Sequence, residues 1–140
     1  MSQALVAAVS PITLIPDEER GSFIPKLLPG VPLIMAENYI FDILSNLCRD
    51  YRGGLWNYYR THNGALYSAP TGYGQMRLMC DGNFFDDEMS EDAAGIVATL
   101  FTLSHLSFRY PSDAIATNYE KLREFSYRHP ESVLISRAID

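Results

Sequence analysis

The residues best suited to acid–base chemistry are Ser104 and His105, which lie side by side near the end of a long apolar segment. With a nearby acid such as Asp92 they could serve a small hydrolase, in which the histidine acts as a general base. Adjacent residues on a helix point in different directions, which argues against a working pair. A histidine in such a segment is more often buried and hydrogen-bonded. We therefore favour a protein without catalytic residues and keep a small hydrolase as the alternative function.

The usual ligands do not have the spacing of a metal or phosphate site. Neither Cys48 nor Cys80 has metal-ligand spacing with His62, His105 or His129. The acids of the chain do not alternate as a calcium loop requires, and the sequence has neither a Walker loop nor a GxSxG elbow. We expect no catalytic residue, no metal and no cofactor, and we interpret His62 and His129 as plain surface residues.

Residues 50–59 combine a charge pair, a double glycine and the only tryptophan. Gly53 and Gly54 can adopt backbone conformations closed to other residues, and they separate a helical period from a strand-like alternation. The alternation places Trp56 and Tyr58 on the same face of a strand. Exposed, these rings would suit a protein interface, whereas helices over both faces of the sheet would bury them. The double glycine is either a plain helix-to-strand turn or part of a working surface.

The excess negative charge lies in one short segment. The net charge is −6, and the six acids of residues 81–92 have no base among them, while acids and bases balance elsewhere. Phosphate binding needs clustered Lys and Arg, so a nucleic-acid groove is not supported. The segment is either a solvated loop next to a helix N-terminus or a patch that faces a basic surface of a partner. The six acids are Asp81, Asp86, Asp87, Glu88, Glu91 and Asp92.

Hydrophobic periodicity predicts the elements that position these side chains. Ser90 is a helix cap before a nearly all-apolar helix, and Asn63-Gly64 is a strong hairpin signal. Because consecutive strands with short links usually pair, we predict a three-stranded antiparallel meander. The helices are expected at about 36–51, 90–108, 113–128 and 130–138, with one helical turn at 16–20, and the strands at 55–61, 65–69 and 75–80. The fold class is therefore α+β, a small three-stranded antiparallel sheet with four to five helices packed around it.

The chain length favours a single domain over residues 1–140. The apolar run near the start has no preceding Lys or Arg, contains Pro11 and is too short to span a bilayer, so we expect neither a signal peptide nor a membrane anchor. We interpret residues 1–15 as a loosely held N-terminal arm. Two cysteines far apart in the sequence favour a reducing compartment and a cytoplasmic location.

A set of short motifs runs along the chain from about Pro16 to Asp140. They are Asp50-Tyr51-Arg52-Gly53-Gly54 with Trp56 and Tyr58, Asn63-Gly64 with Ala69-Pro70, Glu91-Asp92-Ala93-Ala94-Gly95-Ile96, Ser104-His105, Ser112-Asp113-Ala114, Tyr119, Leu122-Arg123-Glu124, His129-Pro130-Glu131 and Arg137-Ala138-Ile139-Asp140. In order and spacing these motifs resemble the ArdB/KlcA family of antirestriction proteins, which plasmids and genomic islands encode. The N-terminal fifteen residues are peculiar to this sequence.

The resemblance implies a small cytoplasmic α+β protein of a mobile element that relieves type I restriction of unmodified incoming DNA and is not an enzyme. The implied partner is the type I restriction-modification enzyme or an associated host factor. Six acids in a twelve-residue window cannot imitate a long duplex. We therefore expect a monomer that acts by protein contacts, without extended DNA mimicry, strong DNA binding or a membrane. The candidate partner-binding residues are Arg52, Trp56, Asp86, Asp87, Glu88, Arg137 and Asp140.

Overall fold

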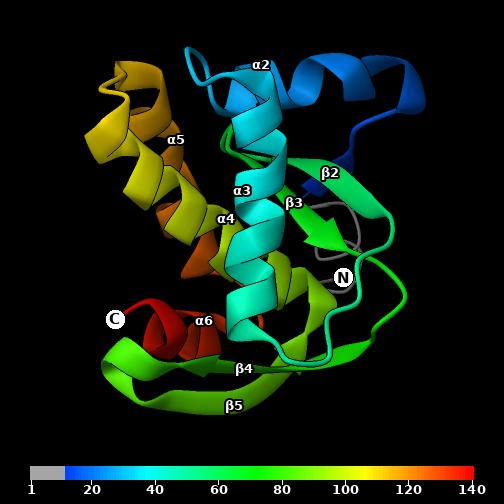
Figure 1. Ribbon diagram of the computed structural model, residues 1–140, viewed down its shortest axis with the longest axis vertical. Coiled ribbons are helices and arrows are strands. Elements are labelled where there is room, and N and C mark those ends of the chain that lie inside the picture. The colour runs from blue at the N-terminus through cyan, green and yellow to red at the C-terminus, as the bar shows by residue number, and fades with distance from the viewer. Residues whose placement is uncertain (1–11) are drawn as a thin grey trace, which may run out of the picture.

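The computed structural model describes residues 12–140 and shows helices packed around two small antiparallel sheets (Figure 1). The strands are β1 (Ile12–Leu14), β2 (Trp56–Thr61), β3 (Leu66–Pro70), β4 (Gln75–Cys80) and β5 (Phe85–Ser90). The helices are α2 (Phe23–Leu27), α3 (Leu33–Leu47), α4 (Glu91–Arg109), α5 (Asp113–Ser126) and α6 (Ser132–Ile139), with short 3-10 turns η1 (Asp17–Ser22) and η2 (Asp81–Asn83). The predicted α+β class and the small three-stranded antiparallel sheet are confirmed.

Helix α4 lies at the centre of the core, between β3 and the helices α3, α5 and α6. Every residue from Ala93 to Leu100 is buried, as the absence of a polar face in the sequence predicts. The helix begins where expected, because the Ser90 hydroxyl accepts a hydrogen bond from the Ala93 N–H at 3.1 Å. Gly95 lets the helix approach β3 closely, since a Cβ at this position would lie 2.4 Å from the Cα of Ala69.

The composition of the first sheet differs from the predicted meander. Its strand order is β1-β2-β3, so the third strand comes from the N-terminal segment and not from β4. Ile12 pairs with Thr61, and the Ile15 N–H donates to the Tyr58 carbonyl at 2.8 Å. A loosely held arm is therefore wrong for residues 12–15, of which Ile15 is buried in the core. The rest of the expected arm, residues 1–11, lies outside the described residues.

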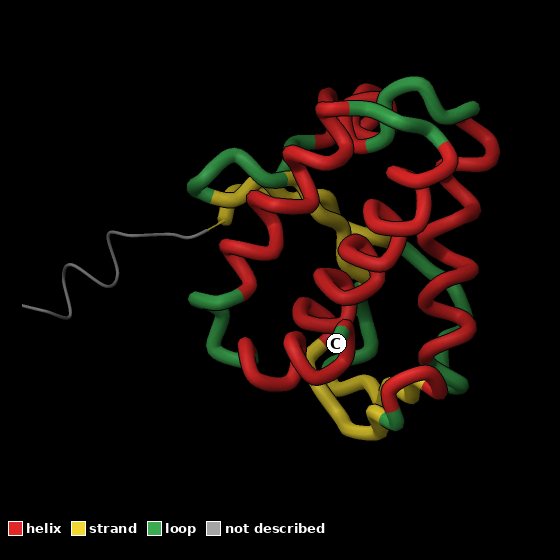
Figure 2. The backbone as a smooth tube through the Cα atoms, turned by 90° about the vertical axis from the view of Figure 1, so that its left-hand side faces the viewer, coloured by secondary structure: helices red, strands yellow, loops and turns green. Residues whose placement is uncertain are grey.

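The middle of the acidic segment, residues 85–90, forms a strand, whereas a solvated loop was one of the two expectations. Strand β5 pairs with β4 in a separate hairpin, which lies at the end of the molecule opposite α2 (Figures 1 and 2). Phe85 and Met89 of β5 are buried, and they face the buried side of β4. The bend between β3 and β4 is held by Glu91, whose carboxylate accepts from the N–H groups of Tyr73 and Gly74, each at 2.8 Å. Strand β4 therefore leaves the first sheet.

The predicted helices are all present, with bounds shifted by a few residues. The largest shift is in α3, which begins directly after Pro32 and ends before Cys48, whose backbone is already extended. Proline suits the start of a helix because its missing N–H would have no partner there. In residues 12–140, no helix is long and apolar enough to cross a membrane.

Candidate interaction surface

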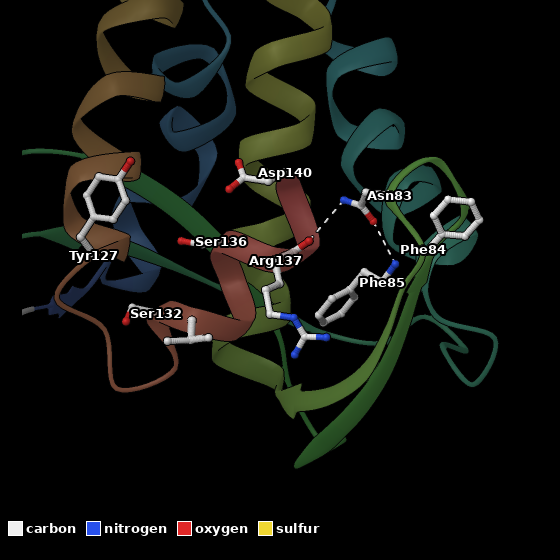
Figure 3. Close-up of a pocket in the computed structure, with 9 residues that line it drawn as sticks. Asn83, Phe84, Phe85, Tyr127, Ser132, Ser136, Arg137 and Asp140 are labelled. Carbon is white, nitrogen blue, oxygen red and sulfur yellow. Dashed lines mark hydrogen bonds between the residues drawn. The ribbon is translucent and has the colours of Figure 1, made fainter.

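Five of the seven candidate partner-binding residues lie on the β4–β5 hairpin or on the C-terminal segment beside it, and Figure 3 shows two of them, Arg137 and Asp140. Strand β5 supplies Asp86, Asp87 and Glu88, and the C-terminal segment supplies Arg137 and Asp140. With the exposed apolar side chains described next, Asp87, Arg137 and Asp140 form what we call the hairpin–α6 surface. Asp86 and Glu88 lie on the opposite face of β5 from the buried Phe85 and Met89. A depression of about 510 Å³ lies within the hairpin–α6 surface, lined by both β5 and α6.

Three exposed apolar side chains border this depression: Phe84, Tyr127 and Val133. Phe84 is 94% exposed, more than any other large hydrophobic side chain of residues 12–140. It also has a φ of 59°, and it is the only residue other than glycine in that range with a positive φ. A left-handed backbone costs a non-glycine residue about 1 kcal/mol or more. An exposed ring held in a strained turn marks a candidate contact residue.

The charged groups of the surface are partly paired. Arg77 Nε lies 2.8 Å from Asp86 Oδ1, Arg137 Nη1 lies 3.5 Å from Asp87 Oδ2, and these contacts span β4, β5 and α6. The hydrogen bond and the charge of Asp86 raise the pKa of the Arg77 guanidinium. Asp140 is 3.6 Å from Arg123 Nη2. The hairpin–α6 surface thus carries apolar side chains and two ion pairs, Arg137–Asp87 and Arg123–Asp140, while the Arg77–Asp86 pair lies on the outer face of the hairpin.

Helix α6 is held in place by hydrogen bonds from the hairpin. Asn83 Nδ2 donates to the carbonyl of Ala138 at 2.8 Å and to that of Arg137 at 3.3 Å. At the other end of α6, the Glu131 carboxylate accepts from the N–H of Ser90 at 2.8 Å and also from its hydroxyl. These hydrogen bonds hold α6 against the hairpin, so the two elements form one continuous surface.

Trp56 does not lie on a surface, so the expectation of an exposed ring is wrong. The side chain is 3% exposed, its indole N–H donates to the Tyr51 hydroxyl at 2.8 Å, and its ring is 5.2 Å from that of Phe41. Both faces of the sheet are covered, as the alternative interpretation held. On the Trp56 face Tyr58 stacks on Phe23 at 4.1 Å, and on the other face Tyr67 stacks on Phe125 at 6.1 Å.

Arg52 is exposed but belongs to the loop between α3 and β2. Its backbone N–H donates to the Tyr73 hydroxyl at 2.8 Å, and that hydroxyl donates to the Gly53 carbonyl at 2.6 Å. Gly53 and Gly54 have φ of 85° and 112°, so the double glycine makes the sharp turn that this loop requires. Its role in the structure is that of a helix-to-strand turn.

The last two acids of the window point away from the hairpin–α6 surface. Glu91 closes the β3–β4 bend, and Asp92 accepts hydrogen bonds from Tyr67 and His129, each at 2.8 Å. His129 is largely buried, so its interpretation as a plain surface residue is wrong. The sequence does not indicate this cluster, because its members lie far apart along the chain and share no spacing pattern.

The residues of the hydrolase alternative are not brought together. Asp92 is in the first turn of α4, and Ser104 is twelve residues along the same helix, which corresponds to about 18 Å. His105 is exposed, and its Nδ1 lies 3.3 Å from the Tyr39 hydroxyl. The imidazole is therefore exposed, whereas a buried ring was expected. Within residues 12–140 it makes no ion pair with a carboxylate.

Comparisons with known proteins agree with the resemblance seen in the sequence. The family model described as "Antirestriction protein" matches residues 49–140. This chain belongs to the antirestriction protein family. It is 40% identical to an antirestriction protein KlcA of Escherichia coli over 139 residues, which covers 94% of this chain and 95% of that protein. It is also 32% identical to the putative antirestriction protein YubI of Escherichia coli K12, with 93% and 96% covered.

A solved structure shows that the family resemblance extends to the fold. The structure is reported for the KlcA and ArdB proteins, described as a novel fold with antirestriction activity against type I DNA restriction systems in vivo but not in vitro. It matches with a TM-score of 0.78 and 36% identity over 94% of this chain and 97% of that one. The ArdB/KlcA resemblance that the motifs predicted is confirmed.

Proposed function

We propose that this antirestriction protein relieves type I restriction of unmodified incoming DNA by binding another protein, and that it is not an enzyme. The observation that supports this most is the match to the KlcA and ArdB structure over nearly the whole chain. Those proteins are described as active against type I systems in vivo but not in vitro. An activity that is present in cells and absent in vitro fits a partner that includes a host factor. The restriction enzyme itself is the other candidate partner.

The distribution of charge supports protein contacts over DNA mimicry. Duplex DNA carries one negative charge per about 1.7 Å of axis, so a mimic needs unpaired acids over a long surface. Of the six acids in the window, Glu91 and Asp92 bind groups of the protein itself, and Asp86 and Asp87 already have arginine partners. We therefore propose neither extended mimicry nor strong binding to DNA.

The hairpin–α6 surface is the place where we propose that the partner binds. An exposed aromatic ring beside an arginine resembles the side chains that dominate the energy of protein interfaces. Arg137 lies over the Phe85 ring at 5.4 Å and so joins the apolar and the charged parts of the surface. We further propose that the protein acts as a monomer in the cytoplasm and is encoded by a mobile element.

Expression of this chain in a host with a type I system is expected to raise the plating efficiency of unmodified phage. The count is compared with that on the same host carrying empty vector and with that of modified phage. An unchanged plating efficiency of unmodified phage, with the protein present and folded, would contradict the proposed function.

Phe84→Asn is expected to lower this protection while it stabilises the fold. Asparagine tolerates a positive φ better than phenylalanine, so the free energy of unfolding should rise by about 1 kcal/mol. A contact residue at the centre of an interface is worth about 2 kcal/mol or more, which would remove most of the protection. Phe108→Asn is the matched control. Phe108 is 86% exposed and lies near the C-terminal end of α4, whereas the hairpin that carries Phe84 precedes the N-terminal end of this helix. Equal protection by the two variants would exclude Phe84 from the interface.

His105→Ala is expected to leave both protection and stability unchanged. The imidazole is exposed and distant from Asp92, so its removal creates no cavity and breaks no ion pair. The measurement is phage plating together with urea unfolding. A loss of protection by a variant of normal stability would revive the hydrolase alternative.

A further inference from the structure

A second cavity, of about 440 Å³, lies on a part of the molecule that shares no lining residue with the hairpin–α6 depression. Its apolar walls are Ile12, Phe125 and Pro130. The rings of His62 and His129 also line it, at 6.0 Å and 6.5 Å from the ring of Phe125. The carboxylate of Asp92 opens into this largely apolar space, with a third of its side chain exposed (34%).

Both hydrogen-bond donors to Asp92 are neutral. The Tyr67 hydroxyl donates to Oδ1, and burial raises the pKa of this phenol, so it keeps its proton. His129 Nδ1 accepts the Glu131 N–H at 3.0 Å, so this nitrogen carries no proton of its own. The one ring proton is then on Nε2, which donates to Asp92 Oδ2 at 2.8 Å. The neutral imidazole orients the carboxylate but leaves its charge.

The negative charge of Asp92 therefore has no ion pair with a Lys or Arg within the described part of the chain, and the Arg128 side chain that lines the same cavity makes none with it. No Lys or Arg nitrogen of residues 12–140 lies within 4.0 Å of its carboxylate. The N-terminus of α4 contributes about half a positive charge, which offsets the carboxylate only in part. Two neutral donors also leave about half of the lone pairs of the carboxylate free to accept. A charge kept at the wall of an apolar cavity favours a ligand of opposite sign.

We propose that this cavity binds an organic cation, an ammonium or guanidinium group on an apolar or aromatic stem. The cationic head would bond the free lone pairs of Asp92, and the stem would pack on Phe125 and Pro130. Planar cations have a further advantage, because they stack on aromatic rings and present paired donors to a carboxylate. The ligand is either a free small-molecule cation or a basic side chain of a polypeptide, and the experiment separates the two.

The test is a titration of the full-length protein with benzamidine and with benzamide, its neutral isostere, followed by NMR of the histidine rings. We expect benzamidine to bind and to shift the His129 signals, and benzamide to bind at least about tenfold more weakly, as the loss of one charge-assisted hydrogen bond predicts. Equal binding of the two would overturn the proposal, since it would show an apolar cavity only. No binding of either would also overturn it.

Two variants and one control test whether the charge of Asp92 binds the cation in this cavity. Asp92→Asn should weaken benzamidine binding by roughly tenfold to a hundredfold. Arg128 lines the cavity and repels a cation, so Arg128→Gln should tighten binding, whereas Arg109→Gln, which removes the same charge at the far end of α4, should change it less. Arg128 is exposed, so this variant keeps the proposal testable if Asp92→Asn fails to fold. Equal effects of the two arginine variants would overturn the proposed location.

The source of the cation is resolved by a second titration. The peptide acetyl-Gly-Arg-Gly-amide is compared with its citrulline analogue, which is neutral, and with n-butylguanidine, which carries the same single guanidinium charge without a peptide backbone. Tighter binding of the peptide assigns the cavity to a basic side chain, and tighter binding of n-butylguanidine assigns it to a free small-molecule cation. Failure of all three ligands to shift the His129 signals would contradict the binding of alkyl guanidinium groups.

Discussion

Gly95→Ala is expected to lower the free energy of unfolding by about 2 kcal/mol or more, because it forces α4 away from β3. The added Cβ would lie 2.4 Å from both the Cα and the Cβ of Ala69 and 2.5 Å from the carbonyl oxygen of Ser68. Carbon atoms pack best at about 3.5–4.0 Å, so the helix or the strand must move by about 1 Å. The better helix propensity of alanine recovers only about 1 kcal/mol. Since β3 and α4 form the centre of the core, the displacement would reach both sheets.

The measurement is thermal and urea unfolding of Gly95→Ala beside Gly21→Ala. Gly21 has no atom within 4 Å of its added Cβ, apart from its chain neighbours, and no positive φ, so it is the matched control. For a chain of this length, the expected loss corresponds to a drop of roughly 5 °C or more in Tm. A Gly95→Ala variant as stable as Gly21→Ala would show that the helix can move away from the strand at little cost.

Helices and one hairpin of this protein could be predicted from local patterns. The 3.6-residue stripes locate α3 and α5, and the nearly all-apolar run after the cap at Ser90 locates α4. Asn63-Gly64 joins β2 and β3 as predicted, with Gly64 at a φ of 86°. These features are decided within about ten residues of sequence, where propensity and capping dominate.

Strand pairing could not be predicted, because distant residues decide it. Half of the six residues of β5 are acids, which are poor strand formers, and only Phe85 and Met89 are buried. What holds the strand is the pairing with β4 and the contact of both strands with α6. Likewise, β1 is three residues long and joins a strand more than forty residues away. Such long-range contacts override a weak local preference.

The candidate site shows the same division. Asp86, Asp87 and Glu88 were predicted from a charge pattern and Arg137 and Asp140 from the family resemblance, and the fold places all five at one end. Phe84, Tyr127 and Val133 carried no signal that separates them from core residues, because exposure depends on the packing around them. A phenylalanine directly after Gly82-Asn83, two turn-forming residues, is the one sequence feature that could have indicated an exposed ring.

Trp56→Ala is expected to destabilise the protein by about 3–5 kcal/mol, the usual cost of truncating a buried aromatic side chain to alanine. The indole fills the space beside Phe41 and Tyr51, and its loss also removes the acceptor role of the Tyr51 hydroxyl. Domains of this kind are stable by about 5–15 kcal/mol, so the variant should be largely folded when cool and partly unfolded at growth temperature. Protection against restriction should then fall as the temperature rises.

This temperature dependence distinguishes a core role of Trp56 from a contact role. The matched control is Leu55→Ala, since Leu55 is the neighbouring residue and is 65% exposed, and its truncation should change stability by less than about 0.5 kcal/mol. If Trp56 supports only the fold, Trp56→Ala protects unmodified phage at low temperature as well as the native chain does. A Trp56→Ala variant with normal unfolding but no protection at any temperature would mean that the ring reaches the partner, which a buried indole hydrogen-bonded to Tyr51 does not allow without local opening.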